Sequence, residues 1–116
     1  MGIPEDLMSP RAAGFVRPAE WELQAATWVS WPGSNPETWP NCREAALDAW
    51  GHFVAVISRY QSVCINAGAV HHDAVRACVA GAGAAMDRVR LFDHPVNDAW
   101  CRDHGPVFVR HVETGE

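Results

Sequence analysis

Apolar and polar positions along the chain follow two different periods. Segments rich in β-branched and aromatic residues, closed by Gly or Pro, predict strands over 26–31, 62–67, 89–92 and 107–112. Two further segments, 42–60 and 72–85, place apolar residues at the three- and four-residue spacing of helices. Because these helices separate the first three strands, the order of elements indicates an α/β fold.

The segment 42–60 carries the clearest helix signals. Asn41 is a favourable N-cap, and Glu44 follows three residues later, as in a capping box. We therefore expect the helix to begin directly after Asn41. Its expected apolar face comprises Ala46, Trp50, Phe53, Val54, Ile57 and Tyr60.

Turn and breaker residues suggest how the chain is organised. Residues 1–19 are expected to form an irregular N-terminal arm, because Pro4, Pro10, Gly14 and Pro18 break regular structure. Residues 20–116 are expected to form the incomplete N-terminal part of a single domain. The reason is that residues 113–116 resemble a hairpin turn that no second strand follows.

Composition and charge exclude several classes of protein. Hydrophobic residues make up 48 % of the 116 residues, which excludes a disordered chain. The net charge is -5 and no Lys is present, so we expect no nucleic-acid partner. Residues 1–10 do not resemble a signal peptide, and no apolar run approaches the roughly 20 residues of a membrane span. We expect a cytoplasmic protein with no membrane partner.

The segment from Asp93 to His104 is the densest cluster of polar side chains. Within it, Trp100 and Asp103 combine an aromatic face with a carboxylate, a pair that suits a guanidinium or ammonium ligand. In the alternative, Asp103 pairs with Arg102 or Arg110 and Trp100 belongs to the core. Spacing alone favours that alternative.

Two other groups of residues could carry chemistry. Cys101 and His104 could form a nucleophile–base pair, but an ordinary core thiol is favoured because such pairs need not be neighbours in sequence. The run 71–73, His-His-Asp, could bind a metal, but adjacent side chains point in different directions. We therefore expect no metal site, and a solvated helix start at 71–73.

The segment 97–106, NDAWCRDHGP, resembles the NDxWxRDxGP signature of the agmatine deiminase and bacterial-type peptidyl-arginine deiminase family. Residues 18–22, PAEWE, with ATW at 26–28 and WP at 31–32, resemble the opening of the same family. The resemblance covers about residues 17–112. It implies a pentein-type α/β propeller, of which this chain would supply only the first blade and the start of the next.

The resemblance also implies a function. Agmatine-acting members hydrolyse agmatine to N-carbamoylputrescine and ammonia in putrescine biosynthesis, without a metal or an organic cofactor. Matched position by position, Trp100 and Asp103 line the substrate pocket, and Asp103 holds the guanidinium group. The family's nucleophilic cysteine forms a covalent thiouronium intermediate and lies outside this chain. Cys101 falls at the variable position of the signature, so no catalytic residue is expected here and the isolated chain is expected to be inactive.

The implied partner is a small cationic guanidino substrate, with agmatine favoured, and a homo-oligomer remains open. One alternative is a peptidyl-arginine deiminase or another guanidino-modifying enzyme of the same fold. An alternative of another class is a non-catalytic binding or interaction module that keeps the pocket scaffold. Segments beyond Glu116 that carry a late Cys and a mid-chain His would distinguish an enzyme from a binding module.

Overall fold

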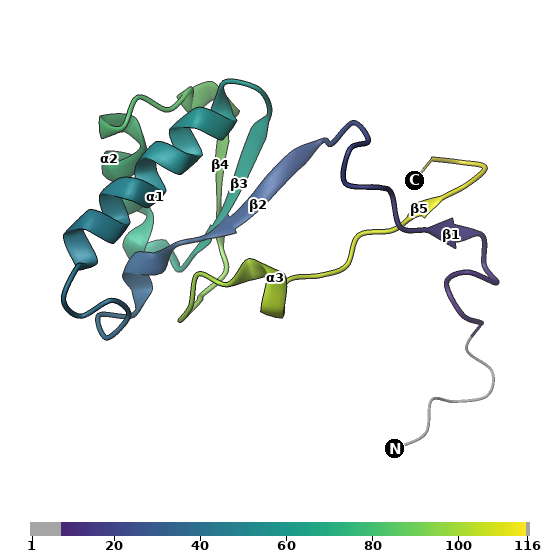
Figure 1. Cartoon of the computed structure of the whole chain (residues 1–116), viewed down its shortest axis with the longest axis horizontal. Coiled ribbons are helices and arrows are strands. Elements are labelled where there is room, and N and C mark those ends of the chain that lie inside the picture. The colour runs from purple at the N-terminus through teal and green to yellow at the C-terminus, as the bar shows by residue number, and fades with distance from the viewer. Residues whose placement is uncertain (1–7, 116) are drawn as a thin grey trace, which may run out of the picture. The chain divides into compact units, whose positions relative to one another are not determined.

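The computed structural model describes residues 8–115, which form two compact units (Figure 1). The larger unit spans Gln24–His104, and the smaller unit combines the segment up to Leu23 with the segment from Gly105. Within the described residues, no helix has both the length and the apolar character needed to cross a bilayer.

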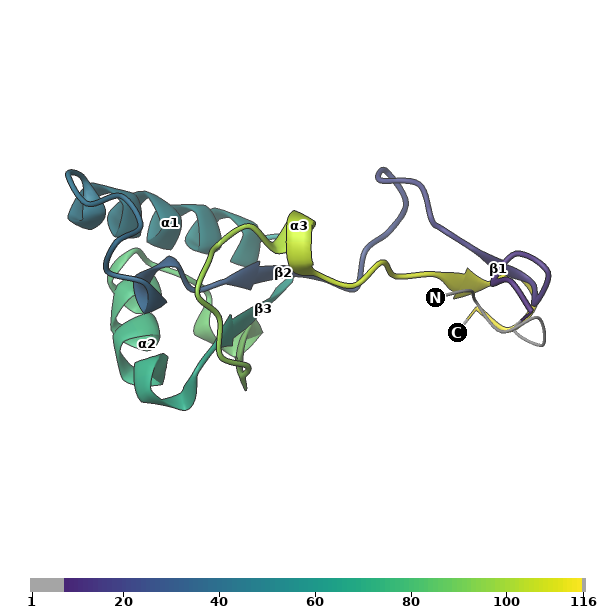
Figure 2. The same cartoon turned by 90° about the horizontal axis from the view of Figure 1, so that it is seen from below.

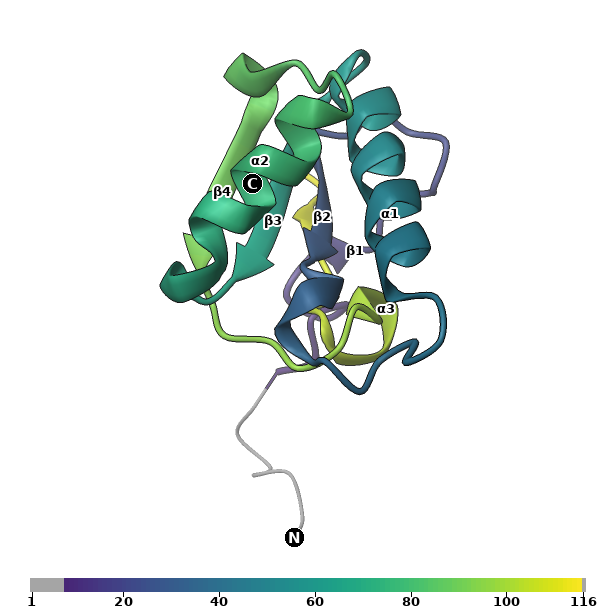
Figure 3. The ribbon, with the colours of Figure 1, turned by 90° about the vertical axis from the view of Figure 1, so that its left-hand side faces the viewer.

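The larger unit is a three-stranded parallel sheet with two helices packed on one side. The strands are β2 (Ala26–Ser30), β3 (Ser62–Ala67) and β4 (Val89–Asp93), in the spatial order β2-β3-β4. The helices are α1 (Arg43–Ser58), α2 (His72–Gly81) and the single turn α3 (Cys101–His104). Figure 3 shows α1 and α2 in front of the strands, as expected for helices that connect neighbouring parallel strands.

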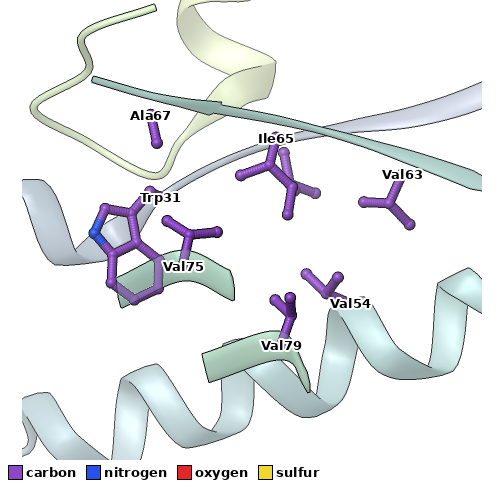
Figure 4. Packing of buried hydrophobic residues seen from close by; sticks show 8 residues of the cluster. Trp31, Val54, Val63, Ile65, Ala67, Val75 and Val79 are labelled. Carbon is purple, nitrogen blue, oxygen red and sulfur yellow. The ribbon is translucent and has the colours of Figure 1, made fainter. Parts of the chain in front are cut away.

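The core lies between β3 and the two long helices. Val63, Ile65 and Ala67 alternate along β3 and are completely buried. Figure 4 shows them with Val54 of α1 and with Val75 and Val79 of α2. Each fully buried Val or Ile stabilises the fold by about 1.5–3 kcal/mol relative to an exposed position.

The expected α/β class and the expected strands and helices of the larger unit are confirmed, with differences at the ends. The expected capping box at Asn41 is wrong. The helix begins at Arg43, so Cys42 occupies the cap position and makes no side-chain capping hydrogen bond. Helix α2 ends at Gly81, four residues earlier than expected, and Gly83 then adopts a φ of +83° that ends the helical path.

The expected apolar face of α1 is only partly correct. Val54 is fully buried, but Phe53 is 52 % exposed and Tyr60 is 81 % exposed. The buried side is rotated toward Gly51, Ala55 and Ser58, because α2 packs there. A Cβ atom on Gly51 would lie 3.0 Å from the sulfur of Cys78, so the missing side chain permits the close approach of α2.

The smaller unit contains one pair of very short strands. Phe15–Val16 (β1) pairs antiparallel with Arg110–His111 (β5), and the ring of Phe15 packs edge-on against His111. The arm expected over 1–19 therefore contains a strand, and its first seven residues lie outside the described part. The strand expected over 107–112 is wrong in length, because only two of its residues find a partner strand.

Candidate functional site

The segment 94–104 passes over the edge of the sheet where the three parallel strands end. In α/β folds, ligands bind outside the carboxyl ends of parallel strands, because loops from several strands converge there. Figure 2 shows α3, at the end of this segment, beside β2. The segment contains most of the signature identified above, so its anchoring decides how the candidate residues are held.

The start of the segment is anchored to the turn that follows β3. The Oδ1 atom of Asp93 accepts a hydrogen bond of 2.8 Å from the backbone N–H of Ala69. The side chains of His94 and Asn66 are hydrogen-bonded through Nδ1 and Oδ1 at 2.9 Å. Gly68 lies close to Pro95, where an added Cβ would meet the proline Cα at 3.8 Å. These contacts fix the position at which the chain leaves β4.

The end of the segment is anchored to β2. The thiol of Cys101 donates a hydrogen bond to the hydroxyl oxygen of Ser30 at 2.9 Å, and Ser30 is almost completely buried. Within the part of the chain that the structure describes, no hydrogen bond joins Cys101 to His104. Cys101 therefore acts as an anchor of α3 in this structure, and the nucleophile–base pair has no geometric support.

Trp100 and Asp103 stand on one turn of the chain. The backbone N–H of Asp103 donates to the carbonyl oxygen of Trp100 at 3.0 Å, which is the hydrogen bond of a tight helical turn. Residues three apart on such a turn lie on the same side of it. The ring and the carboxylate can therefore face one ligand.

Both side chains are accessible. Trp100 is 59 % exposed, so the alternative in which it belongs to the core is wrong. Its indole packs edge-on against Trp39, with the ring centroids 6.5 Å apart. Among residues 8–115, no hydrogen bond or ion pair reaches the exposed carboxylate of Asp103. Arg110, one of its suggested partners, pairs with Glu22 at 3.0 Å. The binding role of Trp100 and Asp103 stays a prediction.

A pocket of about 340 Å³ opens on the same segment, and its lining consists of Pro95, Val96, Asn97 and His104. The lining does not include Trp100 or Asp103, so the pocket and the aromatic–carboxylate pair occupy different parts of the segment. Sequence reasoning gave no role to Trp39 or to this pocket. The high tryptophan content was the only signal that could have drawn attention to Trp39.

Cys64, Cys78 and His72 have structural surroundings. Burial raises the pKa of the Cys64 and Cys78 thiols, and the nearby Asp48 carboxylate raises that of Cys78 further. His72 contacts the carbonyl oxygen of Ala67 through Nε2 at 3.0 Å, while Asp73 pairs with Arg76. Over residues 8–115, no three His, Cys, Asp or Glu side chains are grouped to hold a metal ion.

The comparisons with known proteins bear directly on this site. A family model for Porphyromonas-type peptidyl-arginine deiminase matches residues 16–115. The chain belongs to this family. The match includes the whole of the segment 97–106, and with it Trp100 and Asp103.

Curated relatives match with similar coverage. An agmatine deiminase of Pseudomonas aeruginosa (strain LESB58) is 36 % identical over 103 residues, and one of Ectopseudomonas mendocina (strain ymp) is 35 % identical over 101 residues. Each match covers 87 % of this chain and 26 % of the relative, so the chain spans about a quarter of their length. A solved structure, agmatine deiminase of C. jejuni, superposes with a TM-score of 0.63 at 23 % identity. The superposed region covers 90 % of this chain and 30 % of the C. jejuni chain.

Proposed function

We propose that this chain supplies the guanidinium-recognition part of an enzyme that hydrolyses agmatine to N-carbamoylputrescine and ammonia. One observation carries the proposal: the exposed Asp103 carboxylate, within a matched family segment, has no cationic partner among the described residues. A guanidinium group would provide that partner. The agmatine deiminases among the relatives support agmatine as the substrate.

The chemistry of the pair suits this ligand. A carboxylate accepts two parallel hydrogen bonds from a planar guanidinium and balances its charge. The exposed indole of Trp100 offers a π face to the same cation, an interaction of about 0.5–2 kcal/mol. In this role Asp103 binds and orients the substrate, so that an attacking group approaches the face of the planar guanidinium carbon.

The reaction that the family resemblance implies needs a nucleophile. A thiolate attacks the guanidinium carbon and forms a C–S bond, the C–N bond breaks, and ammonia leaves with the proton it needs. Water then attacks the same carbon and breaks the C–S bond, which releases the carbamoyl product and restores the thiol. Cys64 and Cys78 are poor nucleophiles because burial raises their pKa values. We propose that the nucleophile comes from a segment outside this chain.

The parallel sheet with two helices on one side fits a repeated unit of a larger assembly. We propose that it forms the first blade of a pentein-type α/β propeller. Support comes from the likeness to the C. jejuni structure, which covers only 30 % of that chain. The side of the sheet opposite α1 and α2 carries Trp28 and Phe92, whose ring centroids lie 4.8 Å apart.

Peptidyl arginine is a second candidate substrate, because the matching family is described as a peptidyl-arginine deiminase. A chimera separates the two. This chain would replace the matching segment of the P. aeruginosa agmatine deiminase, and ammonia release would be measured with agmatine and with an arginine-containing peptide. The proposal predicts turnover of agmatine. Preference for the peptide would support the second substrate, and a folded chimera that turns over neither would support a binding module.

A further inference from the structure

The hydrogen bond between Cys101 and Ser30 joins the first residue of α3 to the last residue of β2. Val29 belongs to the core beneath the helices, so Ser30, the next residue of the strand, points to the other side of the sheet. Ser30 is nevertheless almost completely buried. Because α3 lies beside β2 (Figure 2), the Cys101 thiol reaches the buried hydroxyl from that side.

The turn α3 needs contacts outside itself to keep its orientation. It comprises only four residues, and even an isolated helix of about 12 residues is marginal in water. Two such contacts are the bond from Cys101 to Ser30 and the edge-on packing of Trp100 against Trp39. Ser30 belongs to a strand that is paired along its length with β3, whereas Trp39 lies in an irregular turn. The contact to Ser30 is therefore the firmer support.

Cys101 lies between the two residues that are proposed to meet the guanidinium group. Trp100 precedes it directly, and Asp103 follows two residues later in the same tight turn. The indole and the carboxylate are both exposed, so a rotation of the turn would carry them together to a new direction. A bond at Cys101 that prevents this rotation fixes both side chains at once.

The burial of Ser30 makes this bond costly to break. Without the thiol, a hydroxyl that water does not reach would lose its partner, and an unpaired buried polar group is penalised by its full desolvation. The cysteine and the serine therefore depend on each other. Position 101 is the variable position of the signature, so the family resemblance gives no role to this pair.

We propose that Cys101 and Ser30 are positioning residues for guanidinium recognition, because their hydrogen bond fixes α3 on the end of β2. The proposal rests on the proposed function of Trp100 and Asp103, through which the pair acts. A guanidinium held in one orientation presents the face of its carbon to the attacking group, whereas a loosened turn permits many unproductive orientations. Loss of the bond should therefore lower kcat more than it raises KM.

The test measures kcat and KM for agmatine, and the melting temperature, in the chimera with the P. aeruginosa enzyme. Cys101→Ala is expected to lower kcat by about tenfold, and Cys101→Ser, which can donate to the same oxygen, by no more than about threefold. Ser30→Ala should resemble Cys101→Ala and reports on the same bond if that variant does not fold. The double variant should be no worse than the poorer single variant, because both changes remove one interaction.

Two controls separate positioning from general stability. Ser58→Ala removes another fully buried hydroxyl, which donates to the carbonyl of Ala55 at 2.8 Å and accepts from the N–H of Ala85 at 2.9 Å. It should lower the melting temperature and leave kcat unchanged. In an Asp103→Asn background, Cys101→Ala should lower kcat only slightly further, because the residue that it positions is already impaired.

The outcomes distinguish this proposal from the proposed function. It is overturned alone if Asp103→Asn loses activity while Cys101→Ala and Ser30→Ala keep a normal kcat. Additive losses in the double variant, or an equal loss from Cys101→Ala with and without Asp103, would overturn it as well. Normal activity of Asp103→Asn would overturn the proposed function and this proposal together.

Discussion

The indole of Trp39 lies edge-on to the indole of Trp100, with the ring centroids 6.5 Å apart. Trp39 adopts a φ of +54°, which is unusual for a bulky residue. The turn before α1 is thereby tied to the segment that carries Asp103. Trp100 is otherwise well exposed, so this contact is a main restraint on its ring.

Replacement of Trp39 is expected to release the ring of Trp100. Trp39→Asn removes the indole but keeps a residue that tolerates positive φ. Because edge-on aromatic pairs contribute about 0.5–1.5 kcal/mol, the expected loss of unfolding free energy is about 1 kcal/mol. In NMR spectra the indole N–H signal of Trp100 should move and broaden, whereas that of Trp21 should not. An unchanged Trp100 signal would contradict this account of the restraint.

Replacement by alanine is expected to have opposite effects on the unfolding free energy at two glycines of the larger unit. A Cβ on Gly33 would lie 2.3 Å from the ring of Trp31, which is 4 % exposed, whereas a Cβ on Gly81 would meet nothing within 4 Å. Gly33→Ala should lower the unfolding free energy by about 1–3 kcal/mol through overpacking. Gly81→Ala should raise it by about 0.4–1 kcal/mol, because alanine favours the helix. Urea unfolding of both variants measures the difference, and equal effects would contradict the packing at Gly33.

The smaller unit is expected to loosen in acid. The Glu22 carboxylate accepts a hydrogen bond from the N–H of Ala19 and pairs with Arg110, and these contacts lower its pKa. Because the pKa of Glu22 is lowered in the folded state, the ionised carboxylate stabilises the smaller unit fully above the ordinary glutamate pKa of about 4.3. This stabilisation is lost as the pH falls through the lowered pKa.

An NMR titration of the Glu22 side-chain carbon would measure this pKa directly. Arg110→Gln should move it part of the way back toward the ordinary value, because the hydrogen bond from Ala19 is the larger cause and remains. In Glu22→Gln, the β1–β5 signals should lose their acid-dependent change below about pH 4.3. A Glu22 pKa at or above the ordinary value would contradict these contacts.

Much of the larger unit was predictable from sequence because local signals and burial agree there. The run SVCINA at 62–67 is apolar, β-branched and closed by Gly68, and it becomes the fully hydrogen-bonded central strand. The pattern of 42–60 correctly predicted a helix, but its N-cap and part of its core-facing side were wrong. The glycine at position 51 lets α2 approach closely, and a propensity scale counts that glycine only as a cost.

The site was less predictable. The resemblance identified Asp103 and Trp100, but the anchors of their segment are contacts between residues distant in sequence. The bond from Cys101 to Ser30 spans 71 positions, and no spacing rule predicts it. The strand expected over 107–112 is limited to Arg110–His111 for a similar reason: strand pairing depends on a partner strand and not on β propensity alone.

The central claim is that Asp103 holds the guanidinium group of the substrate, and a matched pair of variants tests it most directly. Asp98 lies in the same signature but accepts a hydrogen bond from the N–H of Ala99, which suggests a role in the turn. In the chimera described above, kcat/KM for agmatine would be measured for Asp103→Asn and for Asp98→Asn, together with each melting temperature.

Asp103→Asn keeps the size of the side chain and removes the charge that pairs with the cation. Loss of one partner of a desolvated ion pair costs about 3–5 kcal/mol, so kcat/KM should fall by about 10²–10³-fold or more with little change in melting temperature. Asp98→Asn should act mainly on stability, by about 1 kcal/mol. If Asp103→Asn stays within a few-fold of the unaltered chimera, Asp103 does not hold the guanidinium group and the account is wrong.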